Sequence, residues 1–237
     1  MASVSILHTN DLHGSLDDAR EVALARLRQN ADLYFDTGDA VKSGNLGVPL
    51  RPEPVWERFA RLELSAFVIG NRETHLLEAG FKAKLAGAAQ PVLCANLRLK
   101  SGERPLAGHI VIEAQGLRVG VFGVSVPMVT ELMAARAASA YLWDPPIQVA
   151  AQYVEMLRPN VDVLIGLTHI GHRADINLAE TVPGIDVLLT GHSHTVLETP
   201  LRVNNTWICQ SGSHGRYAGL YTWREGKLTG GLRSLLE

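Results

Sequence analysis

The sequence predicts an α/β protein, and three features of the chain point to that class. Short apolar runs of strand length recur from residue 4 to residue 210. Amphipathic stretches, with apolar residues at helical spacing, lie between most of these runs. The last runs are instead separated by the turn-forming segments "SGSHGRYAG" and "WREGK". Strands that alternate with helices are typical of largely parallel sheets, whereas strands separated only by turns indicate antiparallel hairpins.

Eight apolar runs are the expected strands. They are rich in branched and aromatic side chains and are short, as buried strands are. In chain order they cover residues 4–7, 33–35, 66–69, 91–95, 118–124, 161–167, 185–189 and 206–210. No repeat, low-complexity segment or linker divides them, so we expect a single domain over residues 1–237.

Two helices are placed by their first residues and their apolar faces. Ser15 and Asp18 resemble a capping box, and one face of the helix that follows is formed by Leu16, Ala23, Leu24 and Leu27. Asp144 and Pro145 are residue types typical of an N-cap and a first helical position. The apolar face of this second helix contains Ile147, Ala150, Ala151 and Val154.

The composition argues against several classes of partner. With 22 basic and 24 acidic residues the net charge is -2, which gives no electrostatic basis for binding a nucleic acid polymer or an anionic membrane. Cys94 and Cys209 each lie in an apolar run and are expected to be inert core thiols. No basic leader and no run of about 18 apolar residues is present, so the expected location is the cytoplasm.

Polar residues gather where the predicted strands end. The segments that follow strands in this way are residues 8–14, 36–39, 71–75, 168–169 and 190–194. Loops beyond the carboxyl ends of strands in open α/β sheets come together at one edge, and ligands bind there. We therefore expect these five segments to meet in space.

The side chains in these segments are of the types that bind divalent ions. Taken singly, Asp11 and Asp39 have an alternative interpretation as helix caps or turn residues, Asn71 as a turn residue, and each histidine as an ordinary one. Together, carboxylate, amide and imidazole groups suit manganese, iron or zinc. Two such ions that share a carboxylate activate a bridging water and stabilise an in-line displacement, which is the chemistry of phosphoester hydrolysis.

The motifs that carry this chemistry resemble those of the calcineurin-like metallophosphoesterases. The family's order is matched by D-L-H at 11–13, G-D at 38–39, G-N-R-E at 70–73, T-H at 168–169 and G-H-S-H at 191–194. The opening "ILHTNDLHG", with "PVLCANL", "VGVFGV" and "GLYTW", resembles the 5'-nucleotidase branch. The resemblance implies a four-layer α/β/β/α sandwich of two mixed sheets flanked by helices. It also implies a catalytic domain only, with the C-terminal nucleotidase domain absent.

The resemblance further implies two divalent metal ions and a ligand set for each. One ion would take Asp11, His13 and His194, and the other Asn71, His169 and His192. Asp39 would bridge the two ions. Manganese is the first expectation, with zinc, iron or a mixed pair as alternatives.

The chain departs from the family at Arg72, where the usual motif G-N-H-[DE] has a histidine assigned to protonating the leaving group. Arginine cannot give a proton near neutral pH, but its guanidinium can hold a phosphate through two hydrogen bonds. If "RETHLLEAGF" begins a helix, Arg72 and His75 share a face. We therefore predict that Arg72 is the electrophile and His75 the proton donor, the alternative being that His75 is a plain surface histidine.

Two further histidines are predicted to contact substrate together with Arg72. They are His172 and His214, which are expected in loops near the site and are otherwise ordinary polar loop residues. His8, just before the first motif, is expected to lie behind a ligand.

The sequence thus predicts a metal-dependent phosphoesterase that acts on a small phosphorylated substrate. The reaction would be hydrolysis of a phosphomonoester or of a cyclic or diester phosphate, nucleotides included, by attack of a metal-bridging hydroxide. The alternative is a metal-binding or ligand-sensing protein that kept the ligands and lost turnover when histidine became Arg72. The oligomeric state is left open by the sequence.

Overall fold

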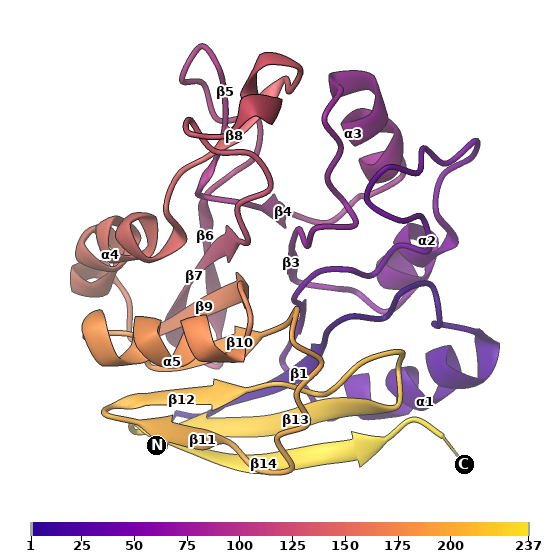
Figure 1. Ribbon diagram of the computed structural model, residues 1–237. Coiled ribbons are helices and arrows are strands. Elements are labelled where there is room, and N and C mark those ends of the chain that lie inside the picture. Colours follow the sequence, from indigo (N-terminus) through magenta and orange to yellow (C-terminus); the bar gives the residue numbers. More distant parts are fainter. Residues whose placement is uncertain (1, 237) are drawn as a thin grey trace.

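A computed structural model describes residues 2–236, which form two six-stranded mixed sheets (Figure 1). The strands of the first sheet are β1 (Val4–Thr9), β2 (Leu33–Asp36), β3 (Ala66–Val68), β4 (Val92–Leu93), β13 (Tyr217–Arg224) and β14 (Lys227–Ser234). Their order is β14-β13-β1-β2-β3-β4. The strands β1 to β4 pair in parallel, and β13 pairs antiparallel with both β1 and β14. Of the hairpins expected from the last runs, the one across "WREGK" is formed by β13 and β14 and extends this first sheet. The hairpin expected across "SGSHGRYAG" is wrong, because residues 206–209 pair within the second sheet whereas β13 pairs with β1.

The second sheet is parallel in its centre and antiparallel at both edges. Its strands are β6 (His109–Ala114), β7 (Leu117–Ser125), β9 (Val163–His169), β10 (Val187–Thr190), β11 (Leu201–Val203) and β12 (Thr206–Cys209). Their order is β11-β12-β10-β9-β7-β6, with β6 and β11 antiparallel to their neighbours. A separate antiparallel pair is formed by β5 (Leu97–Leu99) and β8 (Tyr141–Trp143).

Helices cover the outer face of each sheet. The first sheet is covered by α1 (Asp18–Arg28), α2 (Pro54–Arg61) and α3 (Glu78–Leu85), and the second by α4 (Pro146–Leu157) and α5 (His172–Thr181). Two short 3-10 helices, Ala134–Ala137 and Arg158–Asn160, lie in connections. Between the sheets, apolar side chains of β1 to β3 pack against those of β7, β9 and β10, for example Phe35, Val68 and Ile165. The predicted four-layer α/β/β/α sandwich is confirmed.

Both predicted helix starts are wrong by one or two residues, for local reasons. The N-cap of α1 is Asp17, whose carboxylate accepts the Arg20 backbone N–H, while Ser15 lies in the preceding turn. In α4, Pro145 is extended and the helix begins at Pro146. A residue before proline is disfavoured in the helical region, which excludes Pro145 from the helix.

The two cysteines are buried thiols, as predicted. Burial raises the pKa of Cys94 to about 12 and also raises that of Cys209, so neither is a thiolate near neutral pH. Within residues 2–236, none of the helices combines the length and the hydropathy of a membrane span.

Candidate metal centre

The five polar segments meet where neighbouring strands of both sheets end. In the first sheet, Asp11, Asp39 and Asn71 follow β1, β2 and β3, which lie side by side. In the second sheet, His169 ends β9, and the segment that contains His192 follows β10, the neighbour of β9. The site is thus assembled from both sheets at the carboxyl ends of their parallel strands, as predicted.

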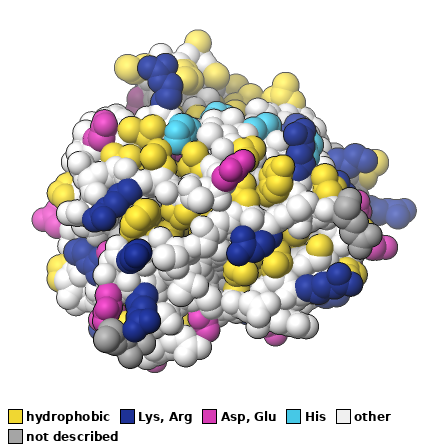
Figure 2. Space-filling model, turned by 90° about the horizontal axis from the view of Figure 1, so that it is seen from below, with side chains coloured by type: hydrophobic (Ala, Val, Ile, Leu, Met, Phe, Trp, Pro, Cys, Tyr) yellow, Lys and Arg dark blue, Asp and Glu magenta, His cyan; other side chains and the backbone are white. Residues whose placement is uncertain are grey.

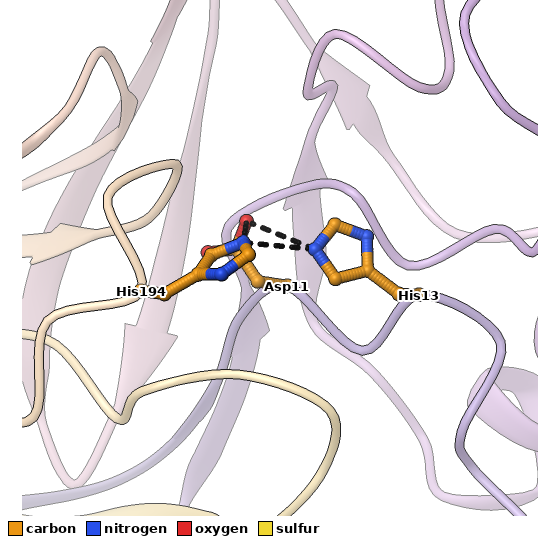
Figure 3. A group of neighbouring side chains, drawn as sticks. All are labelled: Asp11, His13 and His194. Carbon is orange, nitrogen blue, oxygen red and sulfur yellow. Dashed lines mark hydrogen bonds and ion pairs between the residues drawn. The ribbon is translucent and has the colours of Figure 1, made fainter.

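One cluster consists of Asp11, His13 and His194 (Figure 3). The Oδ1 atom of Asp11 lies 3.3 Å from His194 Nε2 and 3.8 Å from His13 Nε2, and the two Nε2 atoms are 2.9 Å apart. Asp11 Oδ1 and His13 Nδ1 are buried without a hydrogen-bond partner among the described residues. Such orphaned atoms are costly unless something binds them.

A second cluster is centred on the side-chain oxygen of Asn71. The Oδ1 atom lies 2.9 Å from His192 Nδ1 and 3.3 Å from His169 Nε2. His169 Nδ1 donates to the carbonyl oxygen of Thr37 at 2.6 Å, because a carbonyl can only accept. In the neutral ring this bond leaves the lone pair on Nε2, which faces Asn71 and is available to a metal ion.

Two carboxylates lie between these clusters. Asp39 Oδ1 is 3.6 Å from His169 Nε2, and its Oδ2 is 3.9 Å from His13 Nδ1, so each oxygen faces a different cluster. Asp11 also groups with Asp39 and His169. Both carboxylates therefore have imidazoles of both clusters as neighbours.

Each carboxylate is oriented by hydrogen bonds that leave one oxygen open. Asp11 Oδ2 accepts from the Asn10 side chain at 2.8 Å and from the His192 backbone N–H at 2.9 Å, which turns Oδ1 toward the cluster. Asn10 is itself held by Ser211, whose N–H and hydroxyl both donate to Asn10 Oδ1. The role of Asn10 was missed from the sequence, although it lies inside the first motif.

Glu73 holds two of the ligand loops together from behind. Its side chain is fully buried, and its Oε2 accepts the backbone N–H of Asp39 at 2.9 Å and of Gly70 at 2.8 Å. Its Oε1 accepts the N–H of Val41 at 3.1 Å. The loops that carry Asp39 and Asn71 are thereby fixed to one carboxylate.

The electrostatics favour the protonation states that metal ions require at His13, His192 and Asp11, but not at His194. Burial, followed by the charge of Arg72, lowers the pKa of His13 to about 4, and burial lowers the pKa of His192. Burial alone would raise the pKa of Asp11, but its interactions with His194 and His169 outweigh burial and lower it. The hydrogen bond with Asp11 raises the pKa of His194.

The residues present fit a pair of divalent ions. The donor set of two carboxylates, one amide and four imidazoles is of the kind that binds manganese, iron or zinc. Neighbouring ligand atoms around an ion with bonds of about 2.1 Å lie roughly 3 to 3.5 Å apart. Those of the two clusters lie 2.9 to 3.8 Å apart before any ion is considered.

Arg72 lies at the edge of this centre, but His75 does not join it. The Arg72 N–H donates to Asp39 Oδ1 at 2.7 Å, and the guanidinium Nε lies 4.0 Å from Asp39 Oδ2. The prediction that Arg72 and His75 share a helical face is wrong, because α3 begins only at Glu78. Thr74 bonds back to Asn71 in a turn, and the His75 ring instead accepts the Leu77 N–H at 3.0 Å.

The two other predicted substrate contacts both lie near the clusters. The His214 ring is 4.8 Å from the ring of His13 and 5.8 Å from that of His194. His172 begins α5 instead of lying in a loop, and its N–H donates to Ser193, between His192 and His194. Figure 2 shows histidine side chains at the surface beside hydrophobic ones. Among the histidines of the site, His192, His194 and His214 are exposed. His8 lies behind the site, with its Nε2 2.9 Å from the Thr37 hydroxyl.

Comparison with known proteins shows what this chain is similar to. The family model described as calcineurin-like phosphoesterase matches residues 4–196. The chain is 29% identical to the trifunctional nucleotide phosphoesterase protein YfkN of Bacillus subtilis over 91% of its own length and 18% of that protein. It is 26% identical to a 5'-nucleotidase of Vibrio cholerae, over 95% of this chain and 50% of that one. The chain thus spans half or less of the length of these relatives.

The fold is shared with solved structures as well. The 5'-nucleotidase precursor of Thermus thermophilus superposes with a TM-score of 0.79 at 22% identity, over 98% of this chain and 54% of that one. Structural similarity at this level of sequence identity establishes the fold alone, and the chemistry follows from the residues of the site.

Proposed function

Because this chain belongs to the calcineurin-like phosphoesterase family, we propose that it hydrolyses phosphate esters at a dinuclear metal centre. The proposed substrates are small phosphomonoesters or cyclic or diester phosphates. Nucleotides are among them, since relatives carry the names 5'-nucleotidase and 2',3'-cyclic-nucleotide 2'-phosphodiesterase. Manganese is the first candidate metal and the cytoplasm the proposed location.

The observation that carries this proposal is the position of Asp11 and Asp39 between two sets of imidazoles. We assign Asp11, His13 and His194 to one ion and Asn71, His169 and His192 to the other, with Asp39 between them. Two ions held there would activate a water and stabilise the charge that develops on the attacking and leaving oxygens.

The chain's own contribution to turnover is to hold and orient the phosphoryl group. Arg72 presents a partly exposed guanidinium next to Asp39, and a guanidinium binds phosphate oxygens in a bidentate manner. Because Arg72 stays protonated, it stabilises charge but gives no proton to a leaving alcohol. His214, beside the His13 ring, and His172, beside Ser193, are also proposed to contact the substrate.

One observation favours a second candidate function. Arg72 replaces the histidine expected to protonate the leaving group, and His75 faces Leu77 instead of the clusters. A protein that binds metal and phosphate but turns over slowly, and so acts as a sensor, is consistent with this arrangement.

One experiment separates the two functions. The purified protein is loaded with Mn²⁺, its metal content is determined by mass spectrometry, and hydrolysis of p-nitrophenyl phosphate and bis(p-nitrophenyl) phosphate is followed. The proposed enzyme binds close to two ions and hydrolyses at least one ester, and chelation abolishes the activity. Full metal content without turnover would support the sensor, and failure to bind metal would contradict both functions.

A further inference from the structure

A small cavity is lined in part by Asn45, the residue that binds the Asn71 side-chain amide. Asn71 Oδ1 faces His169 and His192, while its Nδ2 donates to Asn45 Oδ1 at 3.1 Å. The cavity, of about 210 Å³, begins at Asn45. We name it the Trp143 cavity, and its walls include Asn45, Thr74, His75, Met128, Val129 and Trp143.

Two of its wall residues bond directly to a proposed metal ligand. Besides the bond from Asn71 to Asn45, the Thr74 hydroxyl donates to the Asn71 carbonyl at 2.7 Å. In the sequence, the proposed phosphate-binding residue Arg72 lies between Asn71 and the wall residue Thr74. The wall of the Trp143 cavity is therefore one hydrogen bond away from the proposed metal ligand Asn71.

The wall of the cavity is mostly apolar and has one unused donor. Met128 and Val129 supply apolar surface, and Leu46, 77% exposed, stands at its mouth. Trp143 is only 3% exposed, and its Nε1–H has no hydrogen-bond partner among the described residues. A buried indole N–H normally finds an acceptor, so the free donor indicates a place for one.

We propose that the Trp143 cavity receives the alcohol portion of the substrate, an aromatic or compact apolar group that carries one hydrogen-bond acceptor for Trp143. This inference rests on the proposed function and names the substrate class. Typical ligand pockets measure about 300 to 1,000 Å³, so a cavity of about 210 Å³ accepts a single ring and is too small for a whole nucleoside. The preferred substrate is thus a small aryl phosphate.

The test compares two matched substitutions in the metal-loaded protein. Met128→Trp fills the cavity, and Met133→Trp makes the same change at a residue that is 44% exposed and outside the cavity wall. The value of kcat/KM is measured for phenyl phosphate and methyl phosphate. Steric exclusion of a ring by a filled pocket is expected to lower the phenyl to methyl ratio by about tenfold or more in Met128→Trp, whereas Met133→Trp should keep the wild-type ratio.

A binding measurement that needs no turnover accompanies the rates. Calorimetric titration with phenylphosphonate and methylphosphonate gives the affinity for a ring directly, and Trp143→Phe tests the indole donor with 4-acetylphenylphosphonate, whose ring carries an acceptor. We expect Met128→Trp to lose the preference for phenylphosphonate and Trp143→Phe to lose the preference for the acetylated ring. If Met128→Trp changed the affinity and kcat/KM equally for ring and methyl compounds, the inference about the cavity would be wrong, and the proposed phosphoesterase function would be unaffected. A wild-type protein that hydrolyses none of these esters would instead contradict the proposed function.

Discussion

Replacing Glu73 by glutamine should weaken the metal centre from behind without touching a ligand. In the wild type, one carboxylate accepts three backbone N–H groups, those of Asp39, Gly70 and Val41. Glutamine offers one acceptor oxygen and one donor NH2 group. If the oxygen keeps the two bonds to Asp39 and Gly70, the NH2 group faces the Val41 N–H, and both donors lose a partner in a buried place.

The expected loss of folding stability follows from these two buried donors that lack a partner. A buried donor without a partner costs about 1 to 3 kcal/mol. The two donors together therefore cost about 2 to 6 kcal/mol. For a protein of this size, each kcal/mol shifts the melting temperature by roughly 2 to 4 °C, so Glu73→Gln should lower Tm by about 4 to 24 °C. Since Glu73 also orders the loops of Asp39 and Asn71, Mn²⁺ affinity should fall by about 10- to 100-fold, as is typical for partners of metal ligands.

Glu53→Gln is the matched control. Glu53 is also buried, and its carboxylate accepts the backbone N–H groups of Lys42 and Ser43, but neither of these is a proposed ligand or the neighbour of one in the chain. Thermal unfolding with chelator and calorimetric Mn²⁺ titration are compared for the two variants. Equal Mn²⁺ affinity in Glu73→Gln, Glu53→Gln and wild type would refute the reasoning, whatever the change in Tm.

Three further outcomes are expected. Asp39→Asn should lower the occupancy of both ions because one side chain faces both clusters, and unchanged metal content on mass spectrometry would contradict its bridging role. Arg72→His should raise kcat for alkyl esters relative to aryl esters, because a histidine can protonate a poor leaving group. General acid catalysis is typically worth a factor of about 10² to 10⁴ in rate, which sets the largest increase to expect. Equal changes in kcat for both ester classes would contradict this role. Burial raises the pKa of Asp175 in the folded protein. The stability that Asp175 contributes is therefore full below its pKa of about 3.8 in the unfolded chain, and it is lost as the pH rises toward the folded pKa. Asp175→Asn keeps an acceptor for the Thr168 hydroxyl and should therefore gain Tm over wild type at pH 7 but not at pH 4; a difference in Tm that is the same at both pH values would count against this.

The sheets and the meeting of the polar segments at their edge were predictable because each depends on a local pattern. Buried runs such as 163–167 contain almost no polar side chain, and the polar residue that follows a run marks the sheet edge. The helix expected from Arg72 was not formed, although its sequence is amphipathic. Glu73 binds backbone N–H groups of Asp39 and Val41, far along the chain, and residues 71–74 form a turn closed by the bond from the Thr74 N–H to the Asn71 carbonyl.

The supporting residues could not be predicted, because their partners are mostly backbone groups from distant parts of the chain. Asn10 is held by Ser211 and His169 by the Thr37 carbonyl, across separations of 201 and 132 residues. Nothing in the local sequence of Asn45 marks it as the partner of Asn71. Hydrophobic periodicity reports which face of an element is buried and carries no information on such pairings.

The backbone at the clusters shows how the site keeps its shape. Left-handed φ angles, from 50° to 75°, occur at five of the proposed ligands, namely Asp11, His13, Asp39, His192 and His194. A residue other than glycine in this region costs of order 1 kcal/mol or more, although aspartate and histidine tolerate it better than most. The Asp11 and His13 N–H groups donate to the carbonyls of Gly38 and Asp39 at 2.9 and 2.8 Å, so the first two ligand loops support each other. These bonds are made within the chain, so the conformational cost of the left-handed residues is met when the protein folds. Ion binding does not have to order these loops, and its free energy is therefore not spent on them.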